Sequence, residues 1–219
     1  MNRSTVRFVS FLLIASGTYL AFSAALPLIK YEISSIGISK QDFISPLGEN
    51  PILLNNSNSL VNANNWFTGT PELTHQEVTV KYYKISIPKL KIKDAVVEIA
   101  GEDLSKNLIH FKDTAPPGKP GNAVIFGHST LPQLYNPKSY LTTFTYLPSL
   151  KNDDEIMVDY DGITYKYSVI QMFEVKPEDI EILEQKYDNS YLTLVTCVPP
   201  GTSIKRLIVK AKLVPYHQT

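Results

Sequence analysis

Three residues in the C-terminal half have the types and the spacing that thiol chemistry requires. Cys197, the only cysteine of the chain, stands in the run YLTLVTCVPPG, and Arg206 follows it in RLIVKAKLV. His128 ends the upstream run GNAVIFGH. A thiol near its free pKa of about 8.5 is a weak nucleophile at neutral pH, so it needs a base or a cationic neighbour. A histidine and an arginine would supply both.

Each of these residues also has an ordinary structural interpretation when it is taken alone. A lone cysteine is often a small buried hydrophobic residue, and a histidine at a strand end can simply bond to a loop carbonyl. An arginine at a strand edge is often solvated or paired with a carboxylate. The chemical interpretation therefore depends on whether the fold brings the three residues together.

The elements that must position these residues are predicted to be strands. After residue 81, short runs rich in Val, Ile, Tyr and Thr alternate with Pro, Gly, Asp and Asn, a pattern typical of a β-barrel or β-sandwich. The best helix signal is PEDIEILEQKY at 177–187. The expected strands cover residues 82–90, 94–99, 121–128, 154–160, 163–175, 191–197 and 206–214.

Strand alternation places Cys197 on the same side as Thr193 and Val195, where the sequence VPPG forces a turn. If strands 191–197 and 206–214 pair across this connection, the thiol and the guanidinium of Arg206 lie side by side. On the face of strand 206–214 opposite to Arg206, four side chains are expected to fill the barrel: Leu207, Val209, Ala211 and Leu213.

The N-terminal part predicts a membrane anchor followed by a linker. Residues 8–29 carry no charge and, at about 1.5 Å per helical residue, are long enough to cross a hydrocarbon core of roughly 30 Å. Arg3 and Arg7 predict a cytoplasmic segment 1–7 and an extracellular domain. Small residues at 21–25 leave a cleaved signal peptide as the alternative. Residues 30–80 are rich in Asn and Ser and predict a stalk. Trp66 and Phe67 in this stalk could pack against the domain at 81–219.

Composition argues against two broad classes of function. The 21 basic side chains are balanced by 21 acidic ones, which gives no general reason to expect nucleic acid as a partner. His75, His110, His128 and His217 do not group with carboxylates at metal-ligand spacing, so no cofactor is expected.

Five sequence segments carry a resemblance to a known family. TLVTC at 193–197 resembles the TLxTC signature of sortases, the extracellular cysteine transpeptidases. The resemblance covers about residues 82–214 and implies an eight-stranded sortase-type β-barrel with one or two short helices. It also implies Cys197 as the nucleophile, His128 as general acid and base, and Arg206 as the stabiliser of the oxyanion. The other segments, in sortase order, are IPKLKI at 87–92, TAPPGKPGNAVIFGH at 114–128, FTYLPSLKNDDEIMV at 144–158 and CVPPGTSIKRLIV at 197–209.

The family resemblance implies a reaction in two covalent half-steps. The thiolate attacks a backbone carbonyl of a Leu-Pro-x-Thr-Gly-like sorting signal on a secreted surface protein. An amine from a peptidoglycan precursor or a pilin lysine then resolves the thioacyl enzyme. The segment 175–191 is expected to recognise the sorting signal. The candidate substrate-binding residues are Thr196, Val195, Ile180, Ile182 and Ser129.

Several alternatives stay open at the level of the sequence. The acids at 178–184 resemble in number those that bind calcium in some sortases, although a solvated helix face is the simpler interpretation. The lack of an Asp-Pro pair before the β region and of a second apolar span favours protein anchoring over pilus assembly. The alternative function is a catalytically inactive or purely hydrolytic membrane-tethered β-domain of the same fold.

Overall fold

The computed structural model describes residues 3–35, 38–40 and 80–215. The chain divides into two compact units, Met1–Gly37 and Ile38–Thr219. In the first unit, helix α1 (Arg3–Ser34) contains the segment Ser10–Ser34, which is long and apolar enough to cross a membrane. This property fits both the predicted anchor and the alternative signal peptide. Residues 41–79, which include Trp66 and Phe67 of the predicted stalk, lie outside the described residues.

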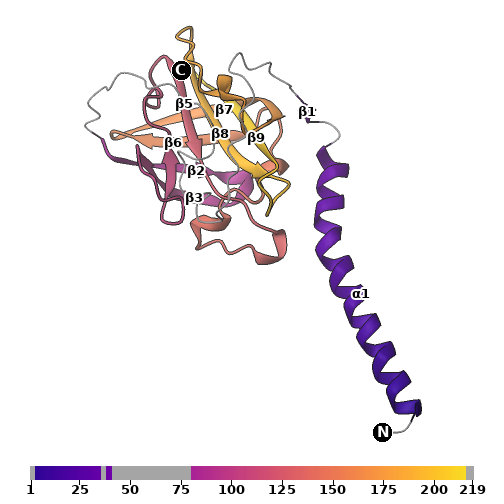
Figure 1. Cartoon of the computed structure of the whole chain (residues 1–219). Helices are drawn as coiled ribbons and strands as arrows, with labels where there is room; N and C mark the ends of the chain where they lie inside the picture. Colours follow the sequence, from indigo (N-terminus) through magenta and orange to yellow (C-terminus); the bar gives the residue numbers. More distant parts are fainter. Residues whose placement is uncertain (1–2, 36–37, 41–79, 216–219) are drawn as a thin grey trace. The chain divides into compact units, whose positions relative to one another are not determined.

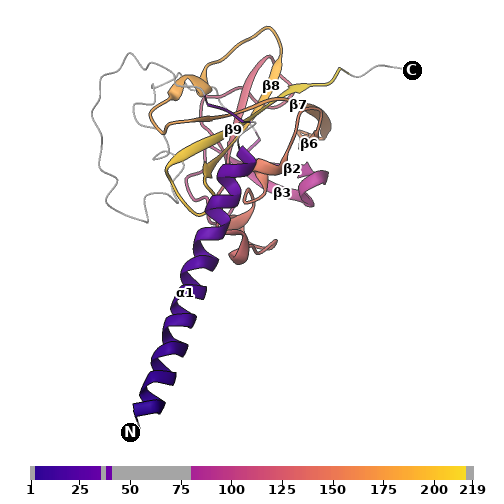
Figure 2. The ribbon, with the colours of Figure 1, turned by 90° about the vertical axis from the view of Figure 1, so that its right-hand side faces the viewer.

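The second unit contains a closed barrel of eight strands (Figures 1 and 2). The strands follow the order β7-β6-β2-β3-β4-β5-β8-β9, and the pairing of β9 with β7 closes the barrel. A short strand β1 (Ser39–Lys40) pairs in parallel with β7. The barrel strands are β2 (Tyr82–Ile87), β3 (Ile92–Ile99), β4 (Leu108–His110), β5 (Gly121–Phe126), β6 (Glu155–Tyr160), β7 (Ile163–Val175), β8 (Ser190–Val198) and β9 (Lys205–Leu213). The predicted eight-stranded β-barrel is confirmed.

Short 3-10 helices occupy the connections between strands. They are η4 (Pro88–Leu90), η5 (Pro132–Leu134), η6 (Tyr140–Thr142), η7 (Leu147–Ser149) and η8 (Ile180–Leu183). The strand expected at 82–90 ends at Ile87 because Pro88 has no N–H for the ladder and begins η4. Strand β4 was not expected from the sequence, because a run of three residues is too short to show alternation. The helix expected at 177–187 is reduced to the four residues of η8.

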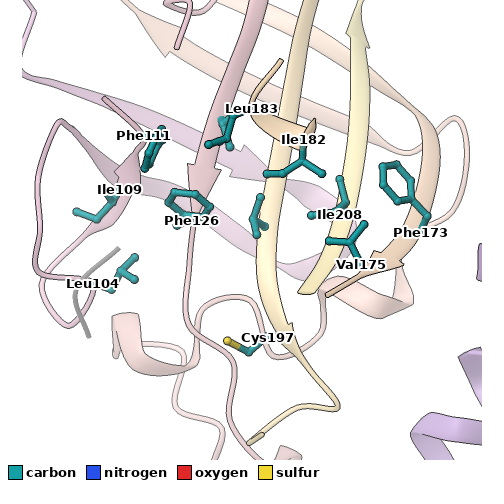
Figure 3. Close-up of a cluster of buried hydrophobic side chains, with 12 residues drawn as sticks. Leu104, Ile109, Phe111, Phe126, Phe173, Val175, Ile182, Leu183, Cys197 and Ile208 are labelled. Atoms are coloured by element: carbon teal, nitrogen blue, oxygen red, sulfur yellow. The ribbon is translucent and has the colours of Figure 1, made fainter. Parts of the chain in front are cut away.

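Strands β8 and β9 separate two apolar environments. The side that carries Leu194, Leu207 and Val209 is fully buried, as expected for the barrel filling. The other side carries Val195 and Ile208, which belong to a second apolar cluster (Figure 3). The cluster also contains Cys197, Phe126 from β5 and, from η8, Ile182 and Leu183. Cys197 therefore lies on the side of β8 that faces away from the barrel interior, in the same apolar cluster as the η8 residues.

Candidate active site

The three chemically competent residues lie at or just beyond the ends of three adjacent strands. Strands β5 and β8 are parallel, with Phe126 beside Val195, so His128 and Cys197 each follow that pair by two residues. Strands β8 and β9 are antiparallel, with Cys197 directly opposite Arg206. This register confirms the predicted pairing across the VPPGTSIK connection. We call His128, Cys197 and Arg206 the strand-end row.

Side chains next to the strand-end row fasten the ends of β5 and β8 to each other. Thr196 Oγ1 donates a hydrogen bond to the carbonyl of Gly127 at 2.8 Å. Ser129 Oγ donates in the opposite direction, to the carbonyl of Cys197, at 2.6 Å. The backbone N–H of Gly127 adds a third bond to the carbonyl of Val195 at 3.1 Å. These bonds fix the distance between the backbones that carry the imidazole and the thiol.

Gly127 permits this close approach because it has no side chain. A Cβ at this position would lie 2.4 Å from Cδ2 of Phe144 and 2.7 Å from Cδ2 of Leu108. Such contacts are far below van der Waals distance, so any larger residue would push the His128 segment away from the barrel.

The Cys197 thiol and the Arg206 guanidinium are both buried, with exposed fractions of 5% and 1%. Burial raises the pKa of the Cys197 thiol, and the charge of Arg206 partly opposes that rise. The guanidinium is oriented by Nη1, which donates to the carbonyls of Ser203 at 3.0 Å and Lys205 at 3.3 Å. The cationic guanidinium of Arg206 is thus held beside the sulfur of Cys197. In this buried place a thiolate would be costly to form without a neighbouring positive charge.

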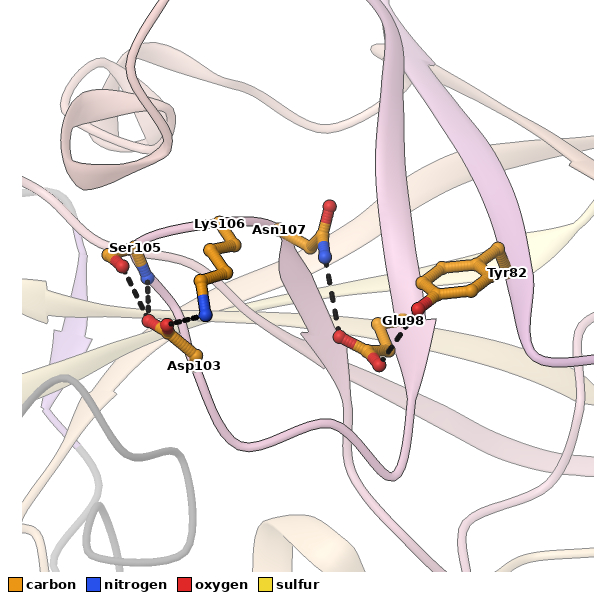
Figure 4. A network of polar contacts seen from close by, with 6 residues as sticks. All are labelled: Tyr82, Glu98, Asp103, Ser105, Lys106 and Asn107. Carbon is orange, nitrogen blue, oxygen red and sulfur yellow. Dashed lines mark hydrogen bonds and ion pairs between the residues drawn. The ribbon is translucent and has the colours of Figure 1, made fainter.

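His128 is half-buried, and burial lowers its pKa from 6.5 to about 4. The carboxylate of Asp103 acts in the opposite direction and favours the imidazolium. Asp103 is itself charged, because hydrogen bonds from Ser105 and Lys106 lower its pKa to about 2 (Figure 4). At neutral pH the His128 imidazole and the Cys197 thiol are therefore both neutral. His128 is thus in the form that accepts a proton.

The predicted substrate-binding residues lie around the strand-end row and the second apolar cluster. Val195 and Thr196 are fully buried, Ile182 is buried within the cluster, and Ile180 packs against it half-buried. Ser129 is half-buried and already bonds to the Cys197 carbonyl. Contacts of these residues with a substrate stay predictions.

The acidic residues near η8 do not form a uniform solvated face. Glu178 and Glu184 are exposed, whereas Asp179 is 3% exposed and accepts a hydrogen bond from the backbone N–H of Lys176 at 2.8 Å. Burial raises the pKa of Asp179. Among the described residues, no group of three or more His, Cys, Asp or Glu side chains converges as metal ligands would.

Sequence reasoning missed two residues that hold η8, Asn122 and Gln185, which lie toward the other end of β5 and β8 from the strand-end row. Both hold the η8 segment against β5 through side-chain amides. For Asn122 a signal was available, because alternation along GNAVIFGH places it on the same side as Val124 and Phe126. Gln185 gives no comparable signal, since its partners lie far away in the sequence.

Comparison with known proteins shows similarity to sortases in sequence. The Sortase domain family model matches residues 85–214. Sortase D of Bacillus subtilis (strain 168) is 26% identical over 134 residues, which cover 59% of this chain and 62% of that protein. Sortase A of Bacillus anthracis is 31% identical over 135 residues, which cover 60% and 59%. The matched region thus spans less than two thirds of the length of these relatives.

Solved structures give the same result. A Clostridium perfringens Sortase D5 transpeptidase matches with a TM-score of 0.51 and 31% identity, covering 61% of this chain and 78% of that one. Sortase C-1 from Actinomyces oris matches with a TM-score of 0.55 and 29% identity, covering 65% and 78%.

Proposed function

Because the chain belongs to the sortase family, we propose that it is a membrane-anchored cysteine transpeptidase. It cleaves a Leu-Pro-x-Thr-Gly-like sorting signal and transfers the released acyl group to an amine. The observation that carries this proposal is the strand-end row, in which Cys197 on β8 lies opposite Arg206 on β9, and His128 follows the last residue pair of β5 with β8 by two positions.

In the first half-reaction, neutral His128 accepts the proton of the Cys197 thiol as the sulfur attacks the substrate carbonyl. A C–S bond forms, and the carbonyl oxygen becomes an oxyanion beside the guanidinium of Arg206. As the C–N bond breaks, the His128 imidazolium gives its proton to the leaving amine. A thioacyl enzyme with a neutral imidazole remains.

In the second half-reaction, an acceptor amine attacks the thioacyl carbonyl and loses a proton to His128. A new C–N bond forms, the C–S bond breaks, and the proton returns to the sulfur, which restores the starting thiol. The acceptor class is the amine of a peptidoglycan precursor or a pilin lysine. The first partner is a secreted surface protein with a C-terminal sorting signal.

The apolar helix supports a location in the cell membrane, with the barrel on the extracellular side. Segment Ser10–Ser34 supplies the span, and Arg7 precedes it on the cytoplasmic side. The reaction as written uses only protein side chains, so we propose no cofactor and no requirement for calcium.

The test uses the full chain in detergent micelles, incubated with a library of Leu-Pro-x-Thr-Gly-like peptides and with triglycine or diaminopimelate as the amine. Intact-protein mass spectrometry detects an acyl adduct on Cys197, and peptide mass spectrometry detects the ligated product. We expect both, in the presence of EDTA as well as without it. An adduct that only water resolves would support the hydrolytic alternative. No adduct with any peptide would contradict the proposal.

A further inference from the structure

The segment that follows η8 is held to the barrel by the side-chain amide of Gln185. Its Oε1 accepts hydrogen bonds from the backbone N–H groups of Ala115 at 3.2 Å and Asn122 at 2.9 Å. Its Nε2 donates to the carbonyls of Asn122 at 3.1 Å and Leu183 at 2.9 Å. A primary amide has two donor hydrogens and one oxygen with two lone pairs, so these four bonds use its whole capacity.

Asn122, at the start of β5, holds the same segment through its own amide. Its Nδ2 donates to the carbonyl of Ile182 at 3.0 Å, and its Oδ1 accepts a hydrogen bond from Thr193 Oγ1 at 2.7 Å. Asn122 and Thr193 are only 2% and 1% exposed, so water does not compete for these bonds. We call Gln185 and Asn122 the amide clamp, because they bind two consecutive carbonyls at the end of η8.

A segment of this kind needs such external bonds to keep one conformation. Helix η8 has four residues, and its N-cap, Asp179, makes no side-chain capping bond. Short 3-10 helices have poor hydrogen-bond geometry and little stability of their own. The clamp also depends on Gly121, where φ is +127° and a Cβ would lie 2.4 Å from Ala115 Cβ and 3.0 Å from Gln185 Oε1. Only glycine leaves room for Gln185 here.

The clamped segment borders the face of the barrel that carries the thiol. Ile182 and Leu183 are 7% and 4% exposed and pack in the same apolar cluster as Val195 and Cys197 (Figure 3). Movement of η8 would therefore reshape the apolar surface that a bound peptide meets on the face that carries Cys197.

We propose that Gln185 is a positioning residue that holds Ile180–Leu183 in the conformation that the sorting signal binds. This inference rests on the function proposed above, in which a peptide is recognised beside Cys197. A segment that is already ordered spares the substrate the cost of ordering it, which strengthens binding. Neutral amides achieve this order, so the segment needs no bound cation.

The test compares the full chain with Gln185→Glu and Gln185→Ala in detergent micelles. Gln185→Glu keeps the shape of the side chain but directs a carboxylate oxygen, in place of a donor, at the carbonyls of Asn122 and Leu183. Glu184→Gln is the matched control, because this neighbouring side chain is exposed and forms a surface ion pair with Lys186 at 3.7 Å. Three readouts are taken: hydrogen exchange of residues 180–185, KM and kcat with a sorting peptide, and the rate of Cys197 alkylation by iodoacetamide.

Both Gln185 variants should show faster exchange in 180–185 and a KM about tenfold higher, as expected when one or two buried hydrogen bonds are lost. Their kcat and alkylation rate should stay within about twofold of the wild type, since the strand-end row is untouched. Glu184→Gln should match the wild type in every readout.

If the wild type is active and the KM is unchanged in both Gln185 variants, this inference is overturned, whatever the hydrogen exchange shows. The proposed function would then still stand. Alkylation that falls in parallel with turnover would overturn the inference too, because Gln185 would then support the thiol itself. A wild type that forms no adduct would overturn the proposed function, and this inference with it.

Discussion

His110 and His128 are associated with neighbouring strands, and burial lowers the pKa of each to about 4. His110 ends β4 and is 1% exposed. Its Nδ1 lies 2.8 Å from the hydroxyl of Tyr83, and its Nε2 lies 2.9 Å from Oγ1 of Thr114. Both ring nitrogens are thus engaged by the barrel, and the ring also packs edge-on against Tyr83.

His128 has the same protonation state in a different setting. It follows β5, stays half-exposed and lies in the strand-end row with Cys197. The difference teaches that burial alone makes a histidine neutral but does not give it a chemical role. In the proposed mechanism neutral His128 acts as the base because it follows β5 at the level of Cys197, whereas His110 belongs to a polar network inside the barrel.

The largest expected difference between the two histidines is in turnover. His128→Ala should lower kcat/KM by at least about 10³-fold, because proton transfer to and from the thiol and the amine is lost. Cys197→Ala should form no acyl adduct. Peptide ligation assays and intact-protein mass spectrometry measure these effects. Circular dichroism should show that the barrel stays folded in both variants. Full activity in Cys197→Ala would rule out the mechanism.

Arg206→Lys sharpens the comparison by changing the third member of the strand-end row. The buried guanidinium orients through two backbone carbonyls, which a lysine ammonium cannot reproduce in the same plane. We expect a loss of about 10²-fold in kcat/KM, as for removal of one oxyanion donor. Wild-type turnover in this variant would show that the charge alone suffices and that the fork geometry is unimportant.

Acid should lower the stability through both histidines, because folded His128 has the same lowered pKa of about 4, and mutation can isolate the share of His110. Unfolded histidine binds a proton below about pH 6.5, whereas folded His110 binds one only below about pH 4. The unfolded state therefore takes up more protons in this window, and the free energy of unfolding should fall as the pH drops from 6.5 to 4. For His110 the loss is on the order of 3 kcal/mol.

Urea unfolding at a series of pH values measures this dependence. In His110→Phe the stability should fall less steeply between pH 6.5 and 4. His128→Ala should remove the share of His128 in the same window and keep the His110 contribution. Identical slopes in wild type and His110→Phe would show that His110 does not carry the acid sensitivity.

The smallest expected effect comes from Tyr83→Phe, which removes the hydroxyl beside His110 and keeps the ring. We expect a loss of about 1 kcal/mol in the free energy of unfolding, typical of one buried hydrogen bond, with unchanged peptide ligation. Tyr82→Phe is the control, because that neighbouring hydroxyl is exposed and bonds to Glu98 at the surface. Equal losses in the two variants would contradict a special role for the buried network.

Local patterns were sufficient to predict most of the strands and the pairing of Cys197 with Arg206, whereas only the family resemblance grouped His128 with them. Alternation in TLVTC and RLIVKAKLV, joined by a short proline turn, sets the register that pairs Cys197 with Arg206. Partners far apart in sequence were not predictable in this way. Tyr83 meets His110 across 27 positions, and Asn122 binds the Ile182 carbonyl across 60. The second contact also helps explain why the helix expected at 177–187 is so short, since the side chain of Asn122 takes a carbonyl that a longer helix would use.

The strand-end row draws its three members from strands that lie next to each other, although long connections separate β5 from β8 in the chain. Because the ladder sets the spacing of the strands, the connections can lengthen, shorten or change composition without displacing the thiol or the guanidinium. The exception is the start of the connection after β5, where Gly127 must stay a glycine to keep the imidazole in place. A deletion of one residue inside β8, by contrast, would turn Cys197 to the barrel interior. A library intended to change substrate preference should therefore diversify the connections and leave the strands unaltered.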